Sequence, residues 1–390
     1  MRILHVTREI GDDRLFGMGR ALAPLVEALA ARGHEVRYLT QDEISPGEAS
    51  RRDRWTGRLR RVLRPVVGEA AHMLGGVFGE RLSMGLVAAD RAHRIDADVV
   101  HLHDPWLALG FALGNRSWGA TRRRWGLSQH GFGCYTEAIR EEGVPTTQRL
   151  LRWQRRAEAR VLQAARFVCS PTELALDQLR RDMALPERPA HWHVVPHALR
   201  IHSMERDEAR RQLGVAPELP MLVAIGRLNP VKRMDQIVQA AVRTQLRVHL
   251  VILGANDAQD LHALLPVDGR VTLELKLVHD VAPWLSACDV YLSATRNESF
   301  GLANLEALAC GAPAICTAVG GVPEVTGGAA WLIPGQDRDL VDLLAARLLD
   351  LLTDANLRRQ WSTRARAHAA RWPGADAVAQ SHETIYRTLV

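Results

Sequence analysis

The chain has 390 residues, and it lacks long apolar runs, paired cysteines and, almost entirely, lysine. No uncharged apolar stretch approaches the roughly 18 residues that a transmembrane helix needs. The first residues, 1–6, follow a strand pattern and do not resemble the apolar core of a signal peptide. The five cysteines are odd in number and none stands in a C-x-x-C pair, which argues against a disulfide framework and against a zinc site. We therefore expect a protein of the reducing cytoplasm.

Basic residues are distributed unevenly along the chain. Residues 1–198 carry 30 basic residues against 23 acidic ones, a balance of +7, whereas residues 199–390 carry 20 against 21, a balance of −1. The excess is concentrated in residues 51–64, where Asp53 is the only acid. The arginines of that segment are Arg51, Arg52, Arg54, Arg58, Arg60, Arg61 and Arg64.

Apolar residues recur at helical spacing among these arginines, namely Trp55, Leu59, Val62 and Leu63. We predict a basic amphipathic helix there that ends near Pro65. A second basic cluster occupies residues 122–125. Such a helix can lie on an anionic membrane surface, where each basic residue contributes about 1 kcal/mol, or it can be a solvated helix whose apolar side packs on its own domain. Nucleic acid is a third possibility, but no recognition motif supports it.

Strand patterns alternate with helical patterns along the whole chain. The predicted strands are 2–7, 35–40, 98–103, 166–170, 193–196, 221–225, 248–253, 271–275, 290–292, 314–316 and 330–333. This alternation predicts an α/β chain with parallel sheets and helices on both faces. Two halves of nearly equal length predict two Rossmann-like domains, 1–198 and 199–372, and a C-terminal helix at about 373–390 that packs back on the first domain.

Two acids, Glu298 and Glu306, flank a Phe-Gly-Leu sequence. A strand pattern precedes them and a helix pattern follows. We therefore expect Gly301 and Leu302 at a strand-to-helix turn, where unpaired backbone N–H groups can hold a phosphate. Carboxylates suit sugar hydroxyls, because one carboxylate accepts two hydrogen bonds from a diol. For either acid alone, a solvated surface position is the alternative.

A second motif, Gly226-Arg227-Leu228-Asn229-Pro230-Val231-Lys232, follows the predicted strand 221–225. In α/β sheets, ligands bind beyond the carboxyl ends of the strands. Arg227 and Lys232 therefore place two cations where a phosphate would bind, one as a bidentate donor and the other as a compact charge. Only Lys232 and Lys276 are lysine among 50 basic residues, which is consistent with a position that arginine cannot fill. A solvated loop is the alternative.

These motifs together resemble the retaining glycosyltransferases of family 4, which have the GT-B fold of two Rossmann-like domains facing each other across a cleft. The resemblance is carried by Gly226-Arg227 with Lys232, by 298–306, by Gly320-Gly321-Val322-Pro323-Glu324 and by Arg32-Gly33-His34-Glu35-Val36. It implies a nucleotide diphosphate sugar as co-substrate, with UDP or GDP as the expected nucleotide. It also implies no metal ion and no other cofactor.

The resemblance implies roles for individual residues. Arg227 and Lys232 would hold the diphosphate and stabilise charge on the leaving group. Glu306 would accept from the ribose hydroxyls and Glu298 from the donor sugar. The implied catalytic residues are His130, Arg227, Lys232 and Glu298. The implied donor-binding residues are Gly17, Gly19, Arg227, Lys232, Leu277, Glu298, Phe300, Gly301, Leu302 and Glu306.

In the first half, Phe16-Gly17-Met18-Gly19-Arg20 follows the first strand. It lacks the third glycine of a dinucleotide fingerprint, so the expected role of Gly17 or Gly19 is to let backbone approach the donor. His130, at the end of an apolar segment, matches the family's active-site histidine, and a packed or capping histidine is the alternative.

His101 and His103 alternate along a strand before Asp104, a pattern that could also hold a metal ion, although no further ligand is evident. The chain departs from the family at Pro196-His197-Ala198, where family members often have Pro-Asn-Gly. The hinge turn is therefore expected to differ.

We expect a retaining glycosyltransferase of cell-surface glycan or glycolipid synthesis. It would be cytoplasmic, or peripheral on the inner face of the membrane through residues 51–64. Its partners would be the nucleotide-sugar donor and a glycan or glycolipid acceptor, and no nucleic acid. Residues 42–90 have no family counterpart and lie where acceptors bind. The alternatives are a GT-B nucleotide-sugar epimerase or hydrolase, and a catalytically silent nucleotide-sugar-binding scaffold.

Overall fold

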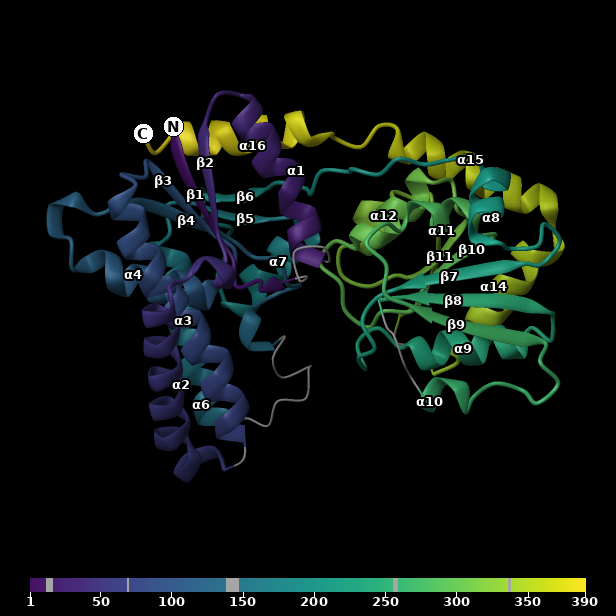
Figure 1. Cartoon of the computed structure of the whole chain (residues 1–390), viewed down its shortest axis with the longest axis horizontal. Helices are drawn as coiled ribbons and strands as arrows, with labels where there is room; N and C mark the ends of the chain where they lie inside the picture. Colours follow the sequence, from purple (N-terminus) through teal and green to yellow (C-terminus); the bar gives the residue numbers. More distant parts are fainter. Residues whose placement is uncertain (12–16, 69, 138–146, 255–258, 336–337) are drawn as a thin grey trace. The chain divides into compact units, whose positions relative to one another are not determined.

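The computed structural model describes residues 1–11, 17–68, 70–137, 147–254, 259–335 and 338–390 (Figure 1). Contacts divide the chain into two units. Unit 1 comprises Met1–Ala198 with Ala375–Val390, and unit 2 comprises Leu199–Gly374. Each unit contains a six-stranded sheet whose paired strands run parallel. The predicted α/β architecture with two parallel sheets is therefore confirmed.

The sheet of unit 1 has the order β2-β1-β3-β4-β5-β6. Its strands are β1 (Arg2–Val6), β2 (Glu35–Leu39), β3 (Val99–Leu102), β4 (Arg124–Ser128), β5 (Val168–Ser170) and β6 (Trp192–Val194). Strand β4 lies outside the predicted strands, because it begins within the basic cluster 122–125 and Gly126 interrupts its apolar run. Successive residues of β1 point to opposite faces, so Leu4 belongs to one core and Ile3 to the other.

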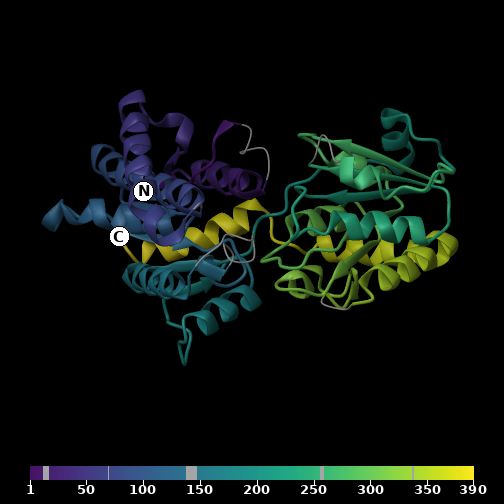
Figure 2. The same ribbon diagram turned by 90° about the horizontal axis from the view of Figure 1, so that it is seen from below.

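Helices cover both faces of this sheet (Figure 1). They are α1 (Gly17–Ala31), α2 (Pro46–Val67), α3 (Ala70–Arg94), α4 (Pro105–Arg116), α6 (Gln148–Ala164), α7 (Glu173–Asp182) and α16 (Ala375–Arg387), with short 3₁₀ turns at Gln41–Glu43 and Gly119–Thr121. Figures 1 and 2 show α16 lying against unit 1. Arg32 donates to Glu383 over 2.8 Å, and the ring of Tyr386 is fully buried. The Arg32-to-Val36 motif therefore anchors the C-terminal helix.

Helices α2, α3 and α4 pack closely through glycines of α3. A side chain at Gly75 or Gly79 would collide with Arg60 or Thr56 of α2, and one at Gly85 would collide with the backbone of α4. Glycine at these positions lets the helix backbones approach each other.

Helix α2 differs from its predicted form in two ways. It continues through Pro65 and ends before Gly68, because the single hydrogen bond lost to Pro65 falls in the last turn. The apolar residues of α2 also do not all lie on one buried side of the helix. Leu59 and Leu63 pack under the helix, whereas Trp55 and Val62 are 58% and 70% exposed beside the arginines.

The sheet of unit 2 has the order β12-β11-β10-β7-β8-β9. Its strands are β7 (Met221–Ile225), β8 (Val248–Leu253), β9 (Val271–Lys276), β10 (Val290–Ser293), β11 (Ala314–Thr317) and β12 (Trp331–Ile333). Its helices are α8 (Arg206–Leu213), α9 (Met234–Arg243), α10 (Gln259–His262), α11 (Ala282–Ala287), α12 (Leu302–Ala309), α13 (Val322–Thr326), α14 (Leu340–Thr353) and α15 (Ala355–Ala369). Buried apolar clusters lie on both faces of this sheet, as parallel sheets require.

Candidate functional site

The predicted donor residues of unit 2 gather at the carboxyl ends of its strands. Arg227 and Lys232 follow β7, and Glu298 follows β10, which pairs with β7. Leu277 follows β9, the edge strand of the sheet. The structure brings Lys232 and Glu298 together: the Lys232 Nζ lies 2.7 Å from Glu298 Oε2. A cation from one motif thus neutralises an acid from the other, although 66 positions separate them in the sequence.

Backbone hydrogen bonds hold the two loops against each other. The Arg296 N–H donates to the carbonyl of Val231 over 2.7 Å, and the Thr295 hydroxyl donates to the same carbonyl over 3.3 Å. Within the first loop, the Lys232 N–H donates to Asn229 Oδ1 over 3.0 Å. Lys232 and Glu298 are therefore positioned by their backbones as well as by their own ion pair.

Gly301 makes the predicted turn between strand and helix. Its φ of 83° lies in the left-handed region, and a side chain there would lie 2.7 Å from Asn304 Nδ2. Helix α12 begins at Leu302, and the Asn304 N–H donates to the carbonyl of Gly301 over 2.9 Å, so the N–H groups of Leu302 and Ala303 are those without an acceptor in the helix. The Gly321 N–H donates to the carbonyl of Glu298 over 2.9 Å, which gives the glycine pair at 320–321 a role in holding this turn.

Glu306 is only 3% exposed on α12. Burial above all raises the pKa of the Tyr291 phenol, and the neighbouring Cys316, Glu298 and Glu306 add to this. Both acids of the 298–306 segment therefore lie near the same buried ring. The Phe300 side chain packs in a small apolar cluster with Trp372, so only its backbone is available to a ligand.

Arg227 and Leu277 are the exposed members of the predicted set in unit 2. Leu277 is 49% exposed, and Arg227 forms no ion pair with any residue that the structure describes. An exposed guanidinium in the same loop as Lys232 can bind an anion without first breaking an ion pair to a described residue.

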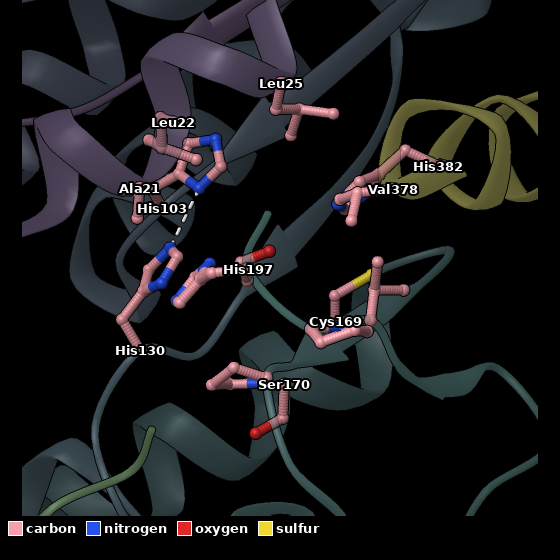
Figure 3. A pocket seen from close by; sticks show the side chains of 14 residues that line it. Ala21, Leu22, Leu25, His103, His130, Cys169, Ser170, His197, Val378 and His382 are labelled. Carbon is pink, nitrogen blue, oxygen red and sulfur yellow. Dashed lines mark hydrogen bonds between the residues drawn. The ribbon is translucent and has the colours of Figure 1, made fainter. Parts of the chain in front are cut away.

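The predicted residues of unit 1 lie near the carboxyl ends of its strands. Gly17 begins α1 with a φ of 49°, Gly19 is buried within that helix, and Phe16 lies outside the described residues. His130 follows β4 and lines a small cavity, about as large as one water molecule, together with His103, His197 and His382 (Figure 3). Burial lowers the pKa of His130 well below its usual value, with further lowering from neighbouring His197 and His382.

Sequence reasoning missed that unit 1 gathers six histidine rings in one network. They are His5, His101, His103, His130, His197 and His382. The alternation of His101 and His103 was a partial signal, but the partners come from other strands and from α16.

One ring nitrogen from each of His5, His101 and His103 could face a common metal ion, since these three atoms lie within 4.8 Å of one another. His101 already uses both nitrogens, at 2.6 Å from Tyr386 Oη and 2.8 Å from Ser128 Oγ. The side chain of Asp104 pairs instead with Arg81 and caps α4. Both nitrogens of His101 are therefore occupied by hydrogen bonds to other side chains of unit 1.

Two exposed helix faces of unit 1 combine arginine with tryptophan. On α2, Arg51, Arg54, Trp55, Arg58, Arg61 and Val62 are exposed. On α6, Arg149, Arg152, Trp153, Arg156 and Arg160 are exposed. The α6 face was also missed, although its spacing of three and four residues is legible in the sequence. Both helices contribute to one small apolar cluster with Phe78 and Trp106.

The acids near these faces are engaged by other groups of unit 1. Asp53 is exposed on α2 and pairs with Arg52. Glu158 is the acid of α6, and it is buried, where it accepts from the backbone of Tyr135 and Thr136. Glu48 caps the start of α2. Within the described part of the chain, no helix is both long and apolar enough to cross a bilayer.

Two family models match the chain. Residues 205–368 match the model described as glycosyl transferases group 1, and residues 16–198 match the model described as glycosyl transferase 4-like domain. The D-inositol 3-phosphate glycosyltransferase of Xylanimonas cellulosilytica is 31% identical over 409 residues, which cover 95% of this chain and 91% of that protein. The N-acetyl-alpha-D-glucosaminyl L-malate synthase of Bacillus anthracis is 30% identical over 186 residues, about half of each protein at 46% and 48%.

Solved structures share the fold over the full length. Sucrose-phosphate synthase from Thermosynechococcus elongatus has a TM-score of 0.75 and 19% identity, covering 100% of this chain and 99% of that one. Anabaena Alr3699/HepE in complex with UDP-glucose has a TM-score of 0.68 and 17% identity, covering 100% and 99%.

Proposed function

The chain belongs to the group 1 glycosyltransferases and has their GT-B fold, and from this premise we propose that it transfers a sugar from a nucleotide diphosphate sugar to an acceptor hydroxyl with retention of the anomeric configuration. The observation that carries the proposal is the Lys232–Glu298 pair at 2.7 Å at the carboxyl ends of β7 and β10, with Arg227 in the loop that follows β7. Parallel sheets bind ligands at this edge.

Charge explains how this site would favour bond cleavage. Breaking the bond between sugar and phosphate leaves negative charge on the diphosphate. Arg227 and Lys232 are preorganised cations that stabilise that charge without a metal ion, which is usually a large catalytic contribution. Glu298 holds the Lys232 ammonium in place and offers its other oxygen to a donor-sugar hydroxyl.

Retention follows in this proposal from attack on the same face that the leaving group departs from. The departing phosphate oxygen takes the proton of the acceptor hydroxyl as the new bond forms. No protein carboxylate then needs to act as a nucleophile. Glu306 would accept from the ribose hydroxyls, and the first-turn amides of α12 would bind donor oxygens.

UDP and GDP are the nucleotides that we propose for the donor. The Anabaena neighbour was solved with UDP-glucose, which supports UDP, although the low identity limits that likeness to the fold. For the acceptor, we propose a glycan or glycolipid of cell-surface synthesis at the inner face of the membrane. The exposed arginine and tryptophan faces of α2 and α6 support this, since such faces suit an anionic bilayer surface.

Calorimetric titration with UDP, GDP, ADP, TDP and CMP tests the donor site. We expect one nucleoside diphosphate to bind, and Arg227→Ala to weaken it about 10- to 100-fold, the scale of a hydrogen bond to a charged group. The matched control is Arg247→Ala, which removes an exposed arginine at the amino end of β8, the opposite edge of the same sheet.

Equal weakening by both variants would contradict the placement of the site. Binding without sugar transfer in any acceptor mixture would identify a silent nucleotide-sugar-binding scaffold. Consumption of donor without any acceptor product would identify an epimerase or hydrolase.

Flotation with vesicles of neutral or anionic lipid tests the membrane partner. We expect binding to anionic vesicles only, and its loss when Arg54 and Arg58 are both changed to glutamate. The control reverses two exposed arginines of α15 in unit 2, Arg359 and Arg364, which changes the net charge by the same amount. If the α15 variant loses binding as fully as the α2 variant, the attraction depends on net charge and not on this face.

A further inference from the structure

The histidine network follows from strand register. His5 of β1 and His101 of β3 are direct partners in the parallel sheet, so their rings lie on the same face. His103 is two residues further along and lies on that face just beyond the end of β3. His130 lies just beyond the end of β4. The rings thus step from the interior of the sheet toward its carboxyl edge, where the cavity lies.

Three of these rings form a continuous chain of hydrogen bonds. His5 Nδ1 lies 2.9 Å from His103 Nε2, and His103 Nδ1 lies 3.0 Å from His130 Nε2 (Figure 3). Burial lowers the pKa of His5 to about 3 and lowers those of His103 and His130 well below the usual value. All three rings are therefore neutral at pH 7, and each carries a single N–H.

A neutral His103 allows only two arrangements of protons. Both of its nitrogens are occupied, so it must donate through one and accept through the other. If it donates to His130, His5 donates to it and the protons point toward the cavity. If it donates to His5, then His130 donates to it, and His5 must carry its proton on Nε2.

The surroundings of His5 separate these two arrangements. His5 Nε2 is buried and has no hydrogen-bond partner among the described residues. The second arrangement would bury an unpaired N–H there, and orphaned buried N–H groups are rare in folded proteins. The first arrangement leaves only a bare ring nitrogen at that position.

We propose that His103 is a positioning residue for His130, and that the His5–His103–His130 chain holds His130 with its proton on Nδ1. The Nε2 of His130 then accepts a hydrogen bond from the Nδ1–H of His103. Because His130 Nε2 accepts from His103 in this arrangement, it cannot take up a proton as a base. A role of His130 at the donor sugar rests on the proposed function, whereas the proton arrangement does not.

His197 lies against the His130 end of this chain of hydrogen bonds. Its ring stacks on His130 with centroids 5.4 Å apart and planes 14° apart. It stands in the Pro196-His197-Ala198 sequence, where the family often has asparagine. The stack limits rotation of the His130 ring and so supports the single orientation that the chain of hydrogen bonds requires.

Long-range ¹⁵N–¹H correlation NMR of the whole chain with ¹⁵N-histidine tests the proposal directly. We expect His5, His103 and His130 each to carry the proton on Nδ1 at pH 7, with Nε2 bare. Assignment comes from single substitutions. Protons on Nε2 of all three rings, or a mixture of tautomers in His130, would overturn the proposal. The NMR result does not depend on enzymatic activity. If the protein transfers no sugar, the proposed function is wrong, but the NMR spectrum still shows which tautomer His130 adopts.

Two substitutions at His103 test its consequence for turnover. His103→Leu removes the donor to His130, whereas His103→Asn keeps an N–H near the position of Nδ1. We expect His103→Leu to lower kcat about tenfold or more while the donor KM changes little, since loss of tautomer control in a serine protease costs up to about 10⁴-fold. His103→Asn should recover most of that loss and restore the His130 tautomer.

His101→Gln is the matched control, because this ring is equally buried in the network but lies outside the chain. It should leave the His130 tautomer unchanged. If His103→Asn and His103→Leu lower kcat equally while both remain folded, or if His101→Gln shifts the His130 tautomer as His103→Leu does, His103 has only a packing role.

Discussion

Acidification should destabilise unit 1 through its buried histidines. Burial lowers the pKa of His5 and of His382 from 6.5 to about 3 in the folded chain. The unfolded chain therefore takes up a proton at each ring that the folded chain does not. Stability is fully present above pH 6.5 and is lost as the pH falls toward 3. Each ring costs about 2 kcal/mol by pH 5, so the pair costs about 4 kcal/mol.

Glu158 acts in the opposite direction. Burial raises its pKa from 4.5 to about 7, so the folded chain holds this proton more tightly than the unfolded chain. Its contribution grows as the pH falls and reaches about 2 kcal/mol by pH 5. His101, His103 and His130, whose pKa values are also lowered, add to the loss. The histidines therefore dominate, and unit 1 should lose at least about 2 kcal/mol between pH 7 and pH 5.

Urea unfolding at pH 7 and pH 5, followed by a short deuterium pulse at one fixed pH, reports each unit through its own peptides. The unit 1 midpoint should fall by about 1 M or more. Peptides of unit 2 serve as the internal reference. In His382→Leu the loss between the two pH values should shrink by about 2 kcal/mol, because one titrating ring is gone. A unit 1 midpoint that is unchanged or higher at pH 5 would refute the reasoning.

Three further predictions concern single residues. Lys232→Ala should lower kcat about 100-fold or more in a sugar-transfer assay and leave urea unfolding nearly unchanged, and Lys232→Arg should recover only part of the activity; wild-type turnover in the alanine variant would exclude a catalytic role. Gly301→Ala should cost about 1–2 kcal/mol in urea unfolding, since its φ is 83° and the new side chain would press on Asn304; an unchanged midpoint would contradict this. Glu383→Gln should speed hydrogen exchange in α16, because Glu383 accepts from Arg32 and Arg387; protection equal to wild type would show that α16 is held by its apolar contacts alone.

The parallel sheets were predictable because apolar strands and amphipathic helices alternate along the chain. That the predicted donor residues of unit 2 would gather at one edge was predictable, since each motif follows a strand and the carboxyl ends of parallel strands share one edge. Contact between Lys232 and Glu298 depends on β7 and β10 being neighbours, and strand order is not legible in one sequence.

The histidine chain shows the same limit more clearly. The rings of His5 and His130 are linked through His103, and these three residues come from three different parts of the sequence. Only the order β1-β3-β4 and the register of His5 with His101 bring them together. By contrast, the prediction that Trp55 and Val62 lie on the apolar, buried side of α2 was wrong for a local reason. Helical spacing places them near Leu59, but α3 covers only one side of α2, so these two side chains remain in water.

The central claim is retaining sugar transfer at the Arg227–Lys232–Glu298 edge. ¹H NMR of UDP-sugars and GDP-sugars, incubated with the chain and a panel of glycan, glycolipid and simple alcohol acceptors, measures it most directly. We predict release of one nucleoside diphosphate and formation of a new glycoside with the anomeric configuration of the donor, both absent in Lys232→Ala. A donor left intact in every mixture, or a product of inverted configuration, would contradict it.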